Sequence, residues 1–165
     1  MKKEEISQIV KDQREFFKRG KTLPVAYRIA ALKKLRETLE EYEDRLAEAM
    51  MKDLGKSTQE AYMCETGLVI SEISHMLRHV RKYAKNKKVL TPLAQFASSS
   101  YKQPSPYGVV LIMSPWNYPV LLTLDPLVDA IAAGNTVVVK PSNYSSATTA
   151  VLIDMLESIY PKDYV

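Results

Sequence analysis

The sequence predicts an α/β protein whose parallel sheet begins in its last third, after a long helical segment. Val109–Met113 is an apolar run of the length typical of a strand buried on both faces, and Thr136–Val139 is a second run, β-branched throughout. Between them, a mostly apolar segment reaches Ala133 and ends at Gly134-Asn135, residues that tolerate the left-handed conformation after a helix. Strand, crossover helix and strand form a βαβ unit, so we expect two parallel strands that start a doubly wound sheet.

The part of the chain before the sheet, residues 1–86, is predicted to form a helical layer. Apolar residues recur every three or four positions over Lys3–Lys18, and again from Pro24, a suitable first helical residue, to Leu54, with a possible break near Glu40. The same periodicity predicts a third helical region over Thr58–Lys85. Its buried line is expected to contain Val69, Ile73, Met76, Val80 and Tyr83.

Residues 87–107 differ in character and predict an extended β arm. Val89–Pro106 has three prolines, four serines and no helical period, so strand pieces are expected around Ala97 and Tyr101. Residues 108–165 then hold the first βαβα of the sheet, because a helical pattern over 145–160 follows the second strand and stops at Pro161. Tyr164-Val165 are expected to be the first residues of another strand.

Composition fits one globular domain or a part of one, and it limits the classes of partner that the protein can have. The 165 residues are 46% hydrophobic with a net charge of +4 from 23 basic and 19 acidic residues, which gives nucleic-acid binding little support. A single cysteine excludes an internal disulfide and fits a reducing compartment, so we expect a cytoplasmic protein. The N-terminus lacks the apolar core of a secretory signal, and residues 119–133 are too short and too acidic for a membrane span.

Polar residues follow each of the two predicted strands. Ser114–Asn117 come directly after the first strand, and Lys140–Asn143 come at the end of the second. Open parallel sheets bind ligands just beyond the carboxyl ends of their strands. We therefore expect these two segments to form one polar site at an edge of the sheet.

Four short motifs stand in fixed order across this region. They are Gly108-Val109-Val110, Pro115-Trp116-Asn117-Tyr118-Pro119, Ala132-Ala133-Gly134-Asn135 and Lys140-Pro141-Ser142. Together they resemble the N-terminal part of an aldehyde dehydrogenase, closest to the branch that acts on aromatic and on medium- or long-chain aliphatic (fatty) aldehydes. The resemblance implies a truncated aldehyde dehydrogenase fold, in which residues 1–165 are the N-terminal portion of a Rossmann-like cofactor-binding domain and the catalytic domain is absent.

The resemblance gives Asn117 a catalytic role. In this family the matching side-chain amide donates a hydrogen bond to the oxygen of the thiohemiacetal that forms when a cysteine attacks the aldehyde. A neutral amide suits this task because it stabilises developing negative charge without titrating. Local sequence alone equally allows a turn asparagine between prolines, and the ordered motifs favour the catalytic interpretation.

The resemblance also implies a nucleotide cofactor, NAD or NADP. Trp116 would lie against its pyrophosphate and Lys140 would reach the adenosine ribose, although local sequence alone allows a core tryptophan and an ordinary strand-ending lysine. Many family members have a glutamate that repels a 2′-phosphate where this chain has Asn143, so the resemblance does not imply a strict preference for NAD and allows NADP. The implied cofactor-binding residues are Met113, Ser114, Pro115, Trp116, Lys140, Ser142 and Asn143.

Other reactive residues are given structural roles. Cys64 lies in a helical pattern with no strand end or glycine-rich segment beside it and does not match the family's nucleophile, so it is interpreted as a structural cysteine. His75 and His79 are spaced like two metal ligands, but no third ligand is spaced to join them, so no metal site is predicted.

We therefore predict part of an NAD(P)-dependent oxidoreductase that converts an aldehyde to a carboxylic acid, inactive as the 165-residue chain because the reacting thiol is missing. A homo-oligomer is expected through the arm and the exposed sheet edges. Two alternatives remain: a non-catalytic nucleotide-binding or assembly module derived from this fold, and part of an acyl-CoA or acyl-phosphate reductase.

Overall fold

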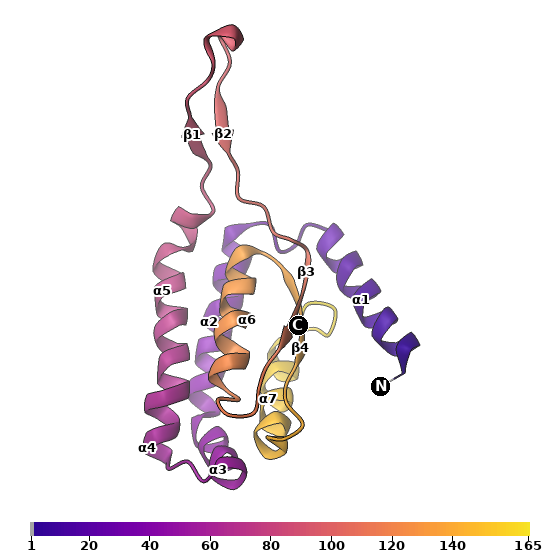
Figure 1. The fold of residues 1–165 in the computed structure, drawn as a ribbon, viewed down its shortest axis with the longest axis vertical. Coiled ribbons are helices and arrows are strands. Elements are labelled where there is room, and N and C mark those ends of the chain that lie inside the picture. Colours follow the sequence, from indigo (N-terminus) through magenta and orange to yellow (C-terminus); the bar gives the residue numbers. More distant parts are fainter. Residues whose placement is uncertain (1) are drawn as a thin grey trace.

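The computed structural model describes residues 2–165 and places a helical layer beside a parallel strand pair (Figure 1). A hairpin arm projects from one end of the molecule. The elements in chain order are α1 (Lys3–Lys18), α2 (Val25–Glu41), α3 (Glu43–Leu54), α4 (Thr58–Ala61), the π-helical segment η1 (Tyr62–Thr66), α5 (Gly67–Tyr83), β1 (Lys87–Val89), the 3₁₀ segment η2 (Leu93–Gln95), β2 (Ser100–Lys102), β3 (Val109–Met113), α6 (Leu121–Ala133), β4 (Thr136–Lys140) and α7 (Ser146–Ile159).

The predicted βαβ unit is confirmed. β3 and β4 are parallel and in register from the pair Val109–Thr136 to the pair Met113–Lys140. Gly134 ends α6 with a φ of 94°, the left-handed conformation expected after the helix. The strands are thus joined by a crossover helix, as the alternation of apolar and turn residues predicts.

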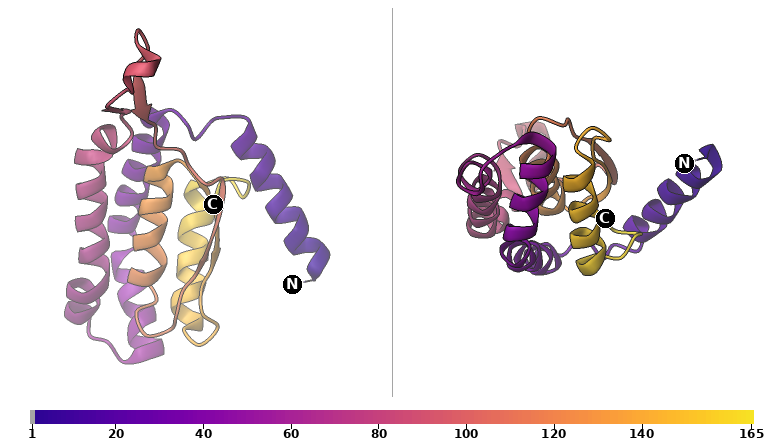
Figure 2. Two further views of the ribbon diagram at one scale, coloured as in Figure 1. Left: turned by 45° about the horizontal axis from the view of Figure 1, so that its top comes forward. Right: turned by 90° about the horizontal axis from the view of Figure 1, so that it is seen from below.

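The core lies between the strand pair and the helices stacked on one side of it. α6 packs on β3 and β4, α2 and α5 pack on α6, and α7 packs on α2 and α3, whereas α1 lies on the other side of the strands (Figure 2). Apolar residues three and four positions apart put one face of each helix in this layer. Fully buried examples are Leu32, Leu35 and Leu39 of α2, Val69 and Ile73 of α5, and Leu124, Leu127 and Ile131 of α6.

The expectation that β3 is buried on both faces is wrong for the residues that the structure describes. Ile112 is buried, but its neighbours Leu111 and Met113 are 58% and 71% exposed. Successive side chains of a strand point to opposite faces; α6 covers one face, whereas α1, on the other face, leaves Leu111 and Met113 exposed. The outer face of the strand pair is therefore open at its carboxyl end.

The helical layer follows the predicted pattern with local differences. Lys3–Lys18 is confirmed, whereas Pro24 is the N-cap of α2 and not its first helical residue, and the break between α2 and α3 falls at Tyr42. The third region is divided by the π-helical segment η1. Tyr83 is 47% exposed and not part of the buried line, because its hydroxyl pairs with His75 Nε2 at 3.0 Å on the outside of α5.

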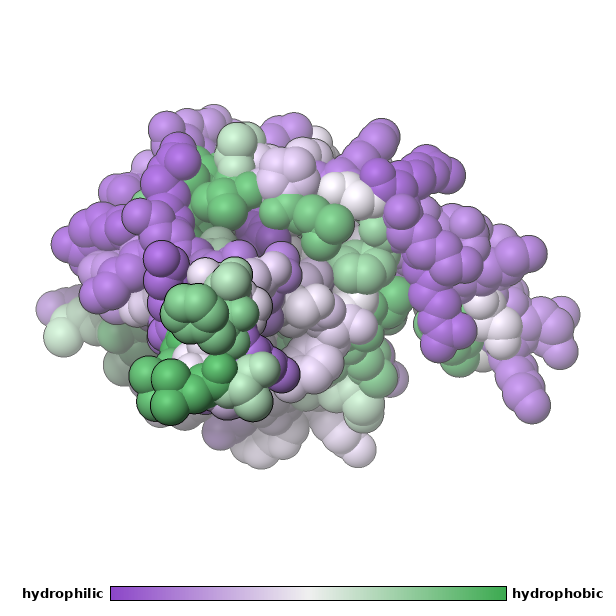
Figure 3. Space-filling view, turned by 90° about the horizontal axis from the view of Figure 1, so that it is seen from above, coloured by the Kyte–Doolittle hydropathy of each residue, from purple (hydrophilic) through white to green (hydrophobic). Residues whose placement is uncertain are grey.

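The arm is an antiparallel hairpin in which β1 pairs with β2. A strand piece around Tyr101 is confirmed, but Ala97 lies in the hairpin tip with a φ of 76°, a turn conformation that no strand contains. Leu90, Leu93 and Phe96 are 90–95% exposed along this arm. Figure 3, which looks onto the arm, shows apolar side chains gathered where it projects.

The residues that follow α7 do not form the expected strand. Tyr164 lies in a turn and is almost fully buried, yet its carbonyl accepts a hydrogen bond from Val137 N of β4 at 2.9 Å. Tyr164 therefore lies along the edge of β4 that β3 does not cover, and it accepts one backbone hydrogen bond there, as a neighbouring strand would. Burial raises the pKa of its phenol, which stacks on Phe16 of α1.

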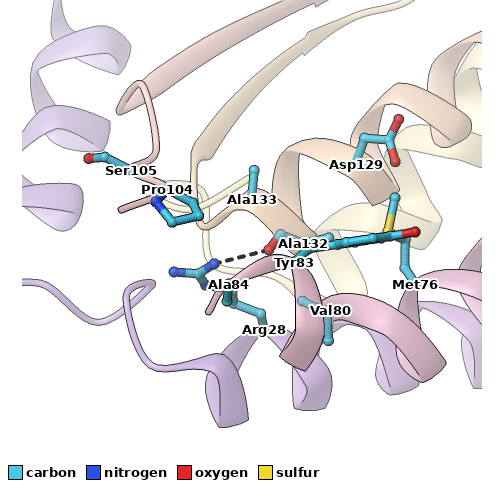
Figure 4. Close-up of a pocket in the computed structure, with 10 residues that line it drawn as sticks. All are labelled: Arg28, Met76, Val80, Tyr83, Ala84, Pro104, Ser105, Asp129, Ala132 and Ala133. Carbon is cyan, nitrogen blue, oxygen red and sulfur yellow. Dashed lines mark hydrogen bonds between the residues drawn. The ribbon is translucent and has the colours of Figure 1, made fainter. Parts of the chain in front are cut away.

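Arg28 joins the start of α2 to the end of α6. Its guanidinium is buried and donates to the carbonyls of Thr22 at 2.9 Å and Leu23 at 2.7 Å. It also donates to the carbonyl of Ala132 at 3.1 Å (Figure 4). Burial lowers the pKa of this group. The surrounding hollow, about 320 Å³ in volume, lies at the base of the arm, and none of the predicted site residues lines it.

Candidate active site

The carboxyl ends of β3 and β4 lie side by side, which brings the two predicted polar segments to one edge of the sheet. Met113 pairs with Lys140 in the parallel register, and Ser114 N donates to Lys140 O at 3.2 Å, one residue beyond the end of β3. Ser114–Asn117 and Lys140–Asn143 therefore leave the strands from the same point. The sequence predicts this juxtaposition correctly, because parallel register follows from the βαβ connection.

Ser114 anchors the turn that follows β3. The buried Ser114 hydroxyl lies 2.6 Å from Thr123 Oγ1. The Thr123 hydroxyl in turn donates to Pro119 O at 2.6 Å. Because the threonine proton is used on the carbonyl, Ser114 Oγ donates to Thr123. The Ser114 side chain is thus already hydrogen-bonded inside the protein, and a ligand could contact Ser114 only through its backbone.

The tip of this turn is exposed. Trp116 is 52% exposed, so it does not belong to the core of residues 2–165, and Pro115 and Asn117 are exposed beside it. Within residues 2–165, the Asn117 side chain has no hydrogen-bond partner, while its backbone carbonyl accepts from Lys56 Nζ at 3.1 Å. The backbone of Asn117 is thus held from inside the protein, whereas the residue is exposed to solvent.

The residues after β4 form a second polar turn. Lys140 is exposed, and its Nζ donates only to the adjacent Pro141 O at 3.1 Å. Ser142 Oγ accepts from Tyr144 N at 3.2 Å, and Ser142 O accepts from Thr149 Oγ1 at 3.0 Å, which ties the turn to α7. Asn143 is exposed at its tip, so Lys140 and Asn143 are both available to a ligand.

Carboxylates from the helical layer occupy the N-termini of both helices that follow the strands. Glu65 Oε2 accepts from Val120 N at 2.8 Å and Leu121 N at 3.1 Å at the start of α6. Asp53 accepts from Ala147 N at 3.1 Å and Thr148 N at 2.7 Å at the start of α7. Helix N-termini are the usual phosphate sites of α/β proteins. At these two ends, however, the backbone amides already donate hydrogen bonds to a carboxylate of the protein. A cofactor phosphate therefore has no place at either helix end.

Sequence reasoning misses Lys56 and Glu65, which lie directly beneath the turn. Glu65 is fully buried and forms an ion pair with Lys56 at 2.5 Å. A charged residue in a helical pattern normally predicts a solvated face, so nothing local distinguishes Glu65. The one available signal is Gly67, an otherwise unfavourable glycine within a helical run.

Cys64 and the two histidines belong to η1 and α5, not to the turns that follow β3 and β4. Cys64 is half-buried next to Glu65 on η1. His75 and His79 stack on each other with ring centroids 4.3 Å apart, and His79 Nδ1 bonds with His75 O at 2.8 Å. Across residues 2–165, no three His, Cys, Asp or Glu side chains are grouped so that they could hold a metal ion.

A parallel strand pair joined by a crossover helix defines an α/β protein, the class whose members bind ligands beyond the carboxyl ends of their strands. The model of the aldehyde dehydrogenase family matches residues 1–165. The chain therefore belongs to the aldehyde dehydrogenase family.

Individual relatives agree with this assignment. The chain is 37% identical to 4,4'-diaponeurosporen-aldehyde dehydrogenase of Staphylococcus aureus over 160 residues, which cover 97% of this chain and 35% of that protein. It is 46% identical to aldehyde dehydrogenase family 3 member B1 of Bos taurus over 143 residues, covering 87% of this chain and 31% of that protein. The chain thus spans about a third of the length of these curated relatives.

Solved structures of this family share the fold. The substrate-bound state of Staphylococcus aureus AldH superposes with a TM-score of 0.94 at 37% identity, over 96% of this chain and 35% of that chain. The NADP-dependent glyceraldehyde-3-phosphate dehydrogenase of Bacillus halodurans in complex with NADP superposes with a TM-score of 0.80 at 25% identity, over 98% of this chain and 34% of that chain. In the part of the chain that the structure describes, no helix is both long and apolar enough to cross a membrane.

Proposed function

We propose that this chain is the N-terminal part of an NAD(P)-dependent aldehyde dehydrogenase that oxidises an aldehyde to a carboxylic acid. The observation that carries the proposal is the parallel register of β3 and β4, which brings Asn117 and Lys140 to one edge of the sheet. Residues 1–165 would form the N-terminal portion of the cofactor-binding domain: 1–86 the helical layer, 87–107 the arm and 108–165 the first βαβα. The reacting cysteine would lie outside them.

Asn117 is proposed to stabilise negative charge on the substrate oxygen. When a cysteine attacks the aldehyde, the carbonyl oxygen gains charge, and an amide N–H that is already aimed at it lowers the barrier without a proton transfer. The exposed Asn117 side chain on an anchored backbone fits this role. An aldehyde of the aromatic or fatty class is the proposed substrate, since relatives of this chain belong to family 3.

The edge residues also fit a dinucleotide cofactor. Lys140 has an ammonium group bonded only to its neighbour's carbonyl, and Trp116, in the turn after the adjacent strand, is 52% exposed. Lys140 and Asn143, with Ser142, would hold the adenosine ribose, and Trp116 with the backbone of Met113, Ser114 and Pro115 would hold the pyrophosphate. The cofactor, when bound, accepts the hydride that leaves the substrate.

Asn143 bears on the choice between NAD and NADP. An exposed neutral amide does not repel a 2′-phosphate as a carboxylate would. The relative from Bacillus halodurans is NADP-dependent by its name. We propose that this chain accepts either cofactor.

The arm is proposed to pair with a second subunit. Leu90, Leu93 and Phe96 are almost fully exposed on it, and exposed apolar residues on a hairpin mark an interaction surface. The chain alone is proposed to be catalytically inactive, because Asn117 can only stabilise an oxyanion that a nucleophile has first created. Cys64, half-buried on η1, is not placed at the strand ends.

A chimera tests the proposal. This chain replaces the corresponding third of the Staphylococcus aureus relative, and turnover of an aldehyde panel is followed by NADH or NADPH absorbance. Asn117→Ala should lower kcat by about 100- to 1000-fold, the scale for one oxyanion donor, while the Kd for cofactor changes little. Asn86→Ala, in an exposed loop, is the matched control. An unchanged kcat for Asn117→Ala would remove Asn117 from the active site.

A further inference from the structure

The buried ion pair between Lys56 and Glu65 lies directly under the turn that carries Asn117. Its charged atoms are 2.5 Å apart, and the two side chains are 10% and 0% exposed. Removing two charges from water is costly, and the pair is stable only where other partners satisfy the remaining donors and acceptors. The positions of those partners therefore show which segment of the chain the ion pair stabilises.

All of the remaining partners of the pair belong to residues 117–121. Glu65 Oε2 takes the amides of Val120 and Leu121 at the start of α6. Lys56 Nζ donates to Asn117 O at 3.1 Å and lies 4.0 Å from the centre of the Tyr118 ring. The carboxylate thus holds the helical end of the turn, and the ammonium holds its tip.

The local backbone around Glu65 supports a dedicated role. Glu65 lies within η1, and Gly67 N closes the π-type bond to Tyr62 O. A Cβ on Gly67 would come within 2.8 Å of that carbonyl, so the segment requires glycine there. π-helical turns inside α-helices are common at functional sites because they redirect a side chain, and here Glu65 is directed into the start of α6.

We propose that Lys56 and Glu65 are positioning residues for Asn117, an inference that rests on the proposed function. The pair fixes the backbone of the turn from below, and the Asn117 amide is therefore aimed outward before any substrate binds. Preorganised donors are effective because no reorganisation is needed when charge develops. Neither residue touches substrate, since both are buried.

Kinetics of the chimera give the first test. Lys56→Met should lower kcat by about 10- to 100-fold, the scale expected for a misplaced catalytic group, with the Kd for cofactor unchanged. Lys56→Arg should restore part of the loss because it keeps the charge and a donor. Lys33→Met, on the exposed side of α2, is the matched control.

A double-mutant cycle separates positioning from general stability. If the pair acts through Asn117, Lys56→Met should cost little when Asn117 is already alanine. An equal fall in kcat on both backgrounds would overturn the inference, because the pair would then act independently of Asn117. Glu65→Gln, which keeps an oxygen for the two amides, repeats the test if Lys56→Met fails to fold.

A spectroscopic test needs no activity. Trp116 is the only tryptophan in the sequence and is adjacent to Asn117, so its fluorescence in the 165-residue chain reports the order of the turn. Lys56→Met should lower its anisotropy and raise its quenching by acrylamide, whereas Lys33→Met should not. Unchanged anisotropy and quenching would overturn the inference. A loosened turn together with an unaffected kcat for Asn117→Ala would instead support the positioning of the turn and refute the proposed function.

Discussion

Replacing Gly134 by alanine should destabilise the protein by more than the cost of placing a non-glycine residue in a left-handed backbone conformation. Gly134 has a φ of 94°, and a Cβ there would lie 2.8 Å from Cζ and Nη2 of Arg28. The end of a flexible side chain normally moves aside at little cost. The Arg28 guanidinium cannot, because it is buried and donates to three carbonyls.

The expected magnitude has two parts. A left-handed conformation costs a non-glycine residue about 1–2 kcal/mol. Displacing the guanidinium weakens at least one hydrogen bond of a charged donor, which contributes about 1.5–3 kcal/mol. Gly134→Ala should therefore lower the free energy of unfolding by about 2.5–5 kcal/mol.

Gly55 provides the matched control. It has a φ of 70°, and no atom lies within 4 Å of a Cβ built on it, so Gly55→Ala should show only the conformational cost. Urea unfolding followed by circular dichroism measures both variants. In an Arg28→Ala background the cost of Gly134→Ala should fall to that of Gly55→Ala. Equal costs for the two glycines in the parent, or no relief by Arg28→Ala, would refute the reasoning.

The remaining predictions concern cofactor choice, pH and assembly. In the chimera, Lys140→Ala should weaken cofactor binding more than it lowers kcat, and Asn143→Glu should shift preference towards NAD; an NADP/NAD affinity ratio that Asn143→Glu leaves unchanged would contradict the ribose assignment. Burial, and to a smaller extent the negative charge of Glu72, raises the pKa of the Asp129 carboxyl above 3.8. The contribution of Asp129 to the free energy of unfolding should therefore fall as pH rises from about 3.8 through the raised pKa. Asp129→Asn should therefore raise the free energy of unfolding at pH 7 by no more than about 0.5 kcal/mol, because the group is exposed, and should leave it unchanged below pH 3.8; equal effects at both pH values in thermal unfolding would contradict it. Finally, the 165-residue chain should oxidise no aldehyde and should scatter light as an oligomer, whereas a monodisperse monomer would refute the role of the arm.

Sequence periodicity is enough to predict the layers and the place of the site. α1 and β3 have the predicted bounds, and β4 and α6 follow from runs of β-branched and apolar residues closed by Gly134. Parallel register follows from the connection, and with it the meeting of Asn117 and Lys140 at one edge. These features depend on neighbours in the chain, which is the information that a pattern contains.

Boundaries set by single residues are less predictable. Ala97 is in a turn and not in a strand, and Tyr164 occupies the edge of β4 without forming a strand. Tyr83 follows the helical period of the buried line, yet it is 47% exposed and its hydroxyl pairs with His75 Nε2. For Tyr164 the deciding neighbour, Val137, is distant in sequence, so no local pattern contains it.

What the sequence by itself determines about this protein is therefore its α/β class, its family and the residues that reach the edge of the sheet. Only the tertiary structure decides how that edge is held. Glu65 and Val120 are far apart in the chain, as are Arg28 and Ala132, yet each pair is bonded. Buried charges need partners that no local pattern specifies, so Lys56, Glu65 and Arg28 become visible only when the helices are packed.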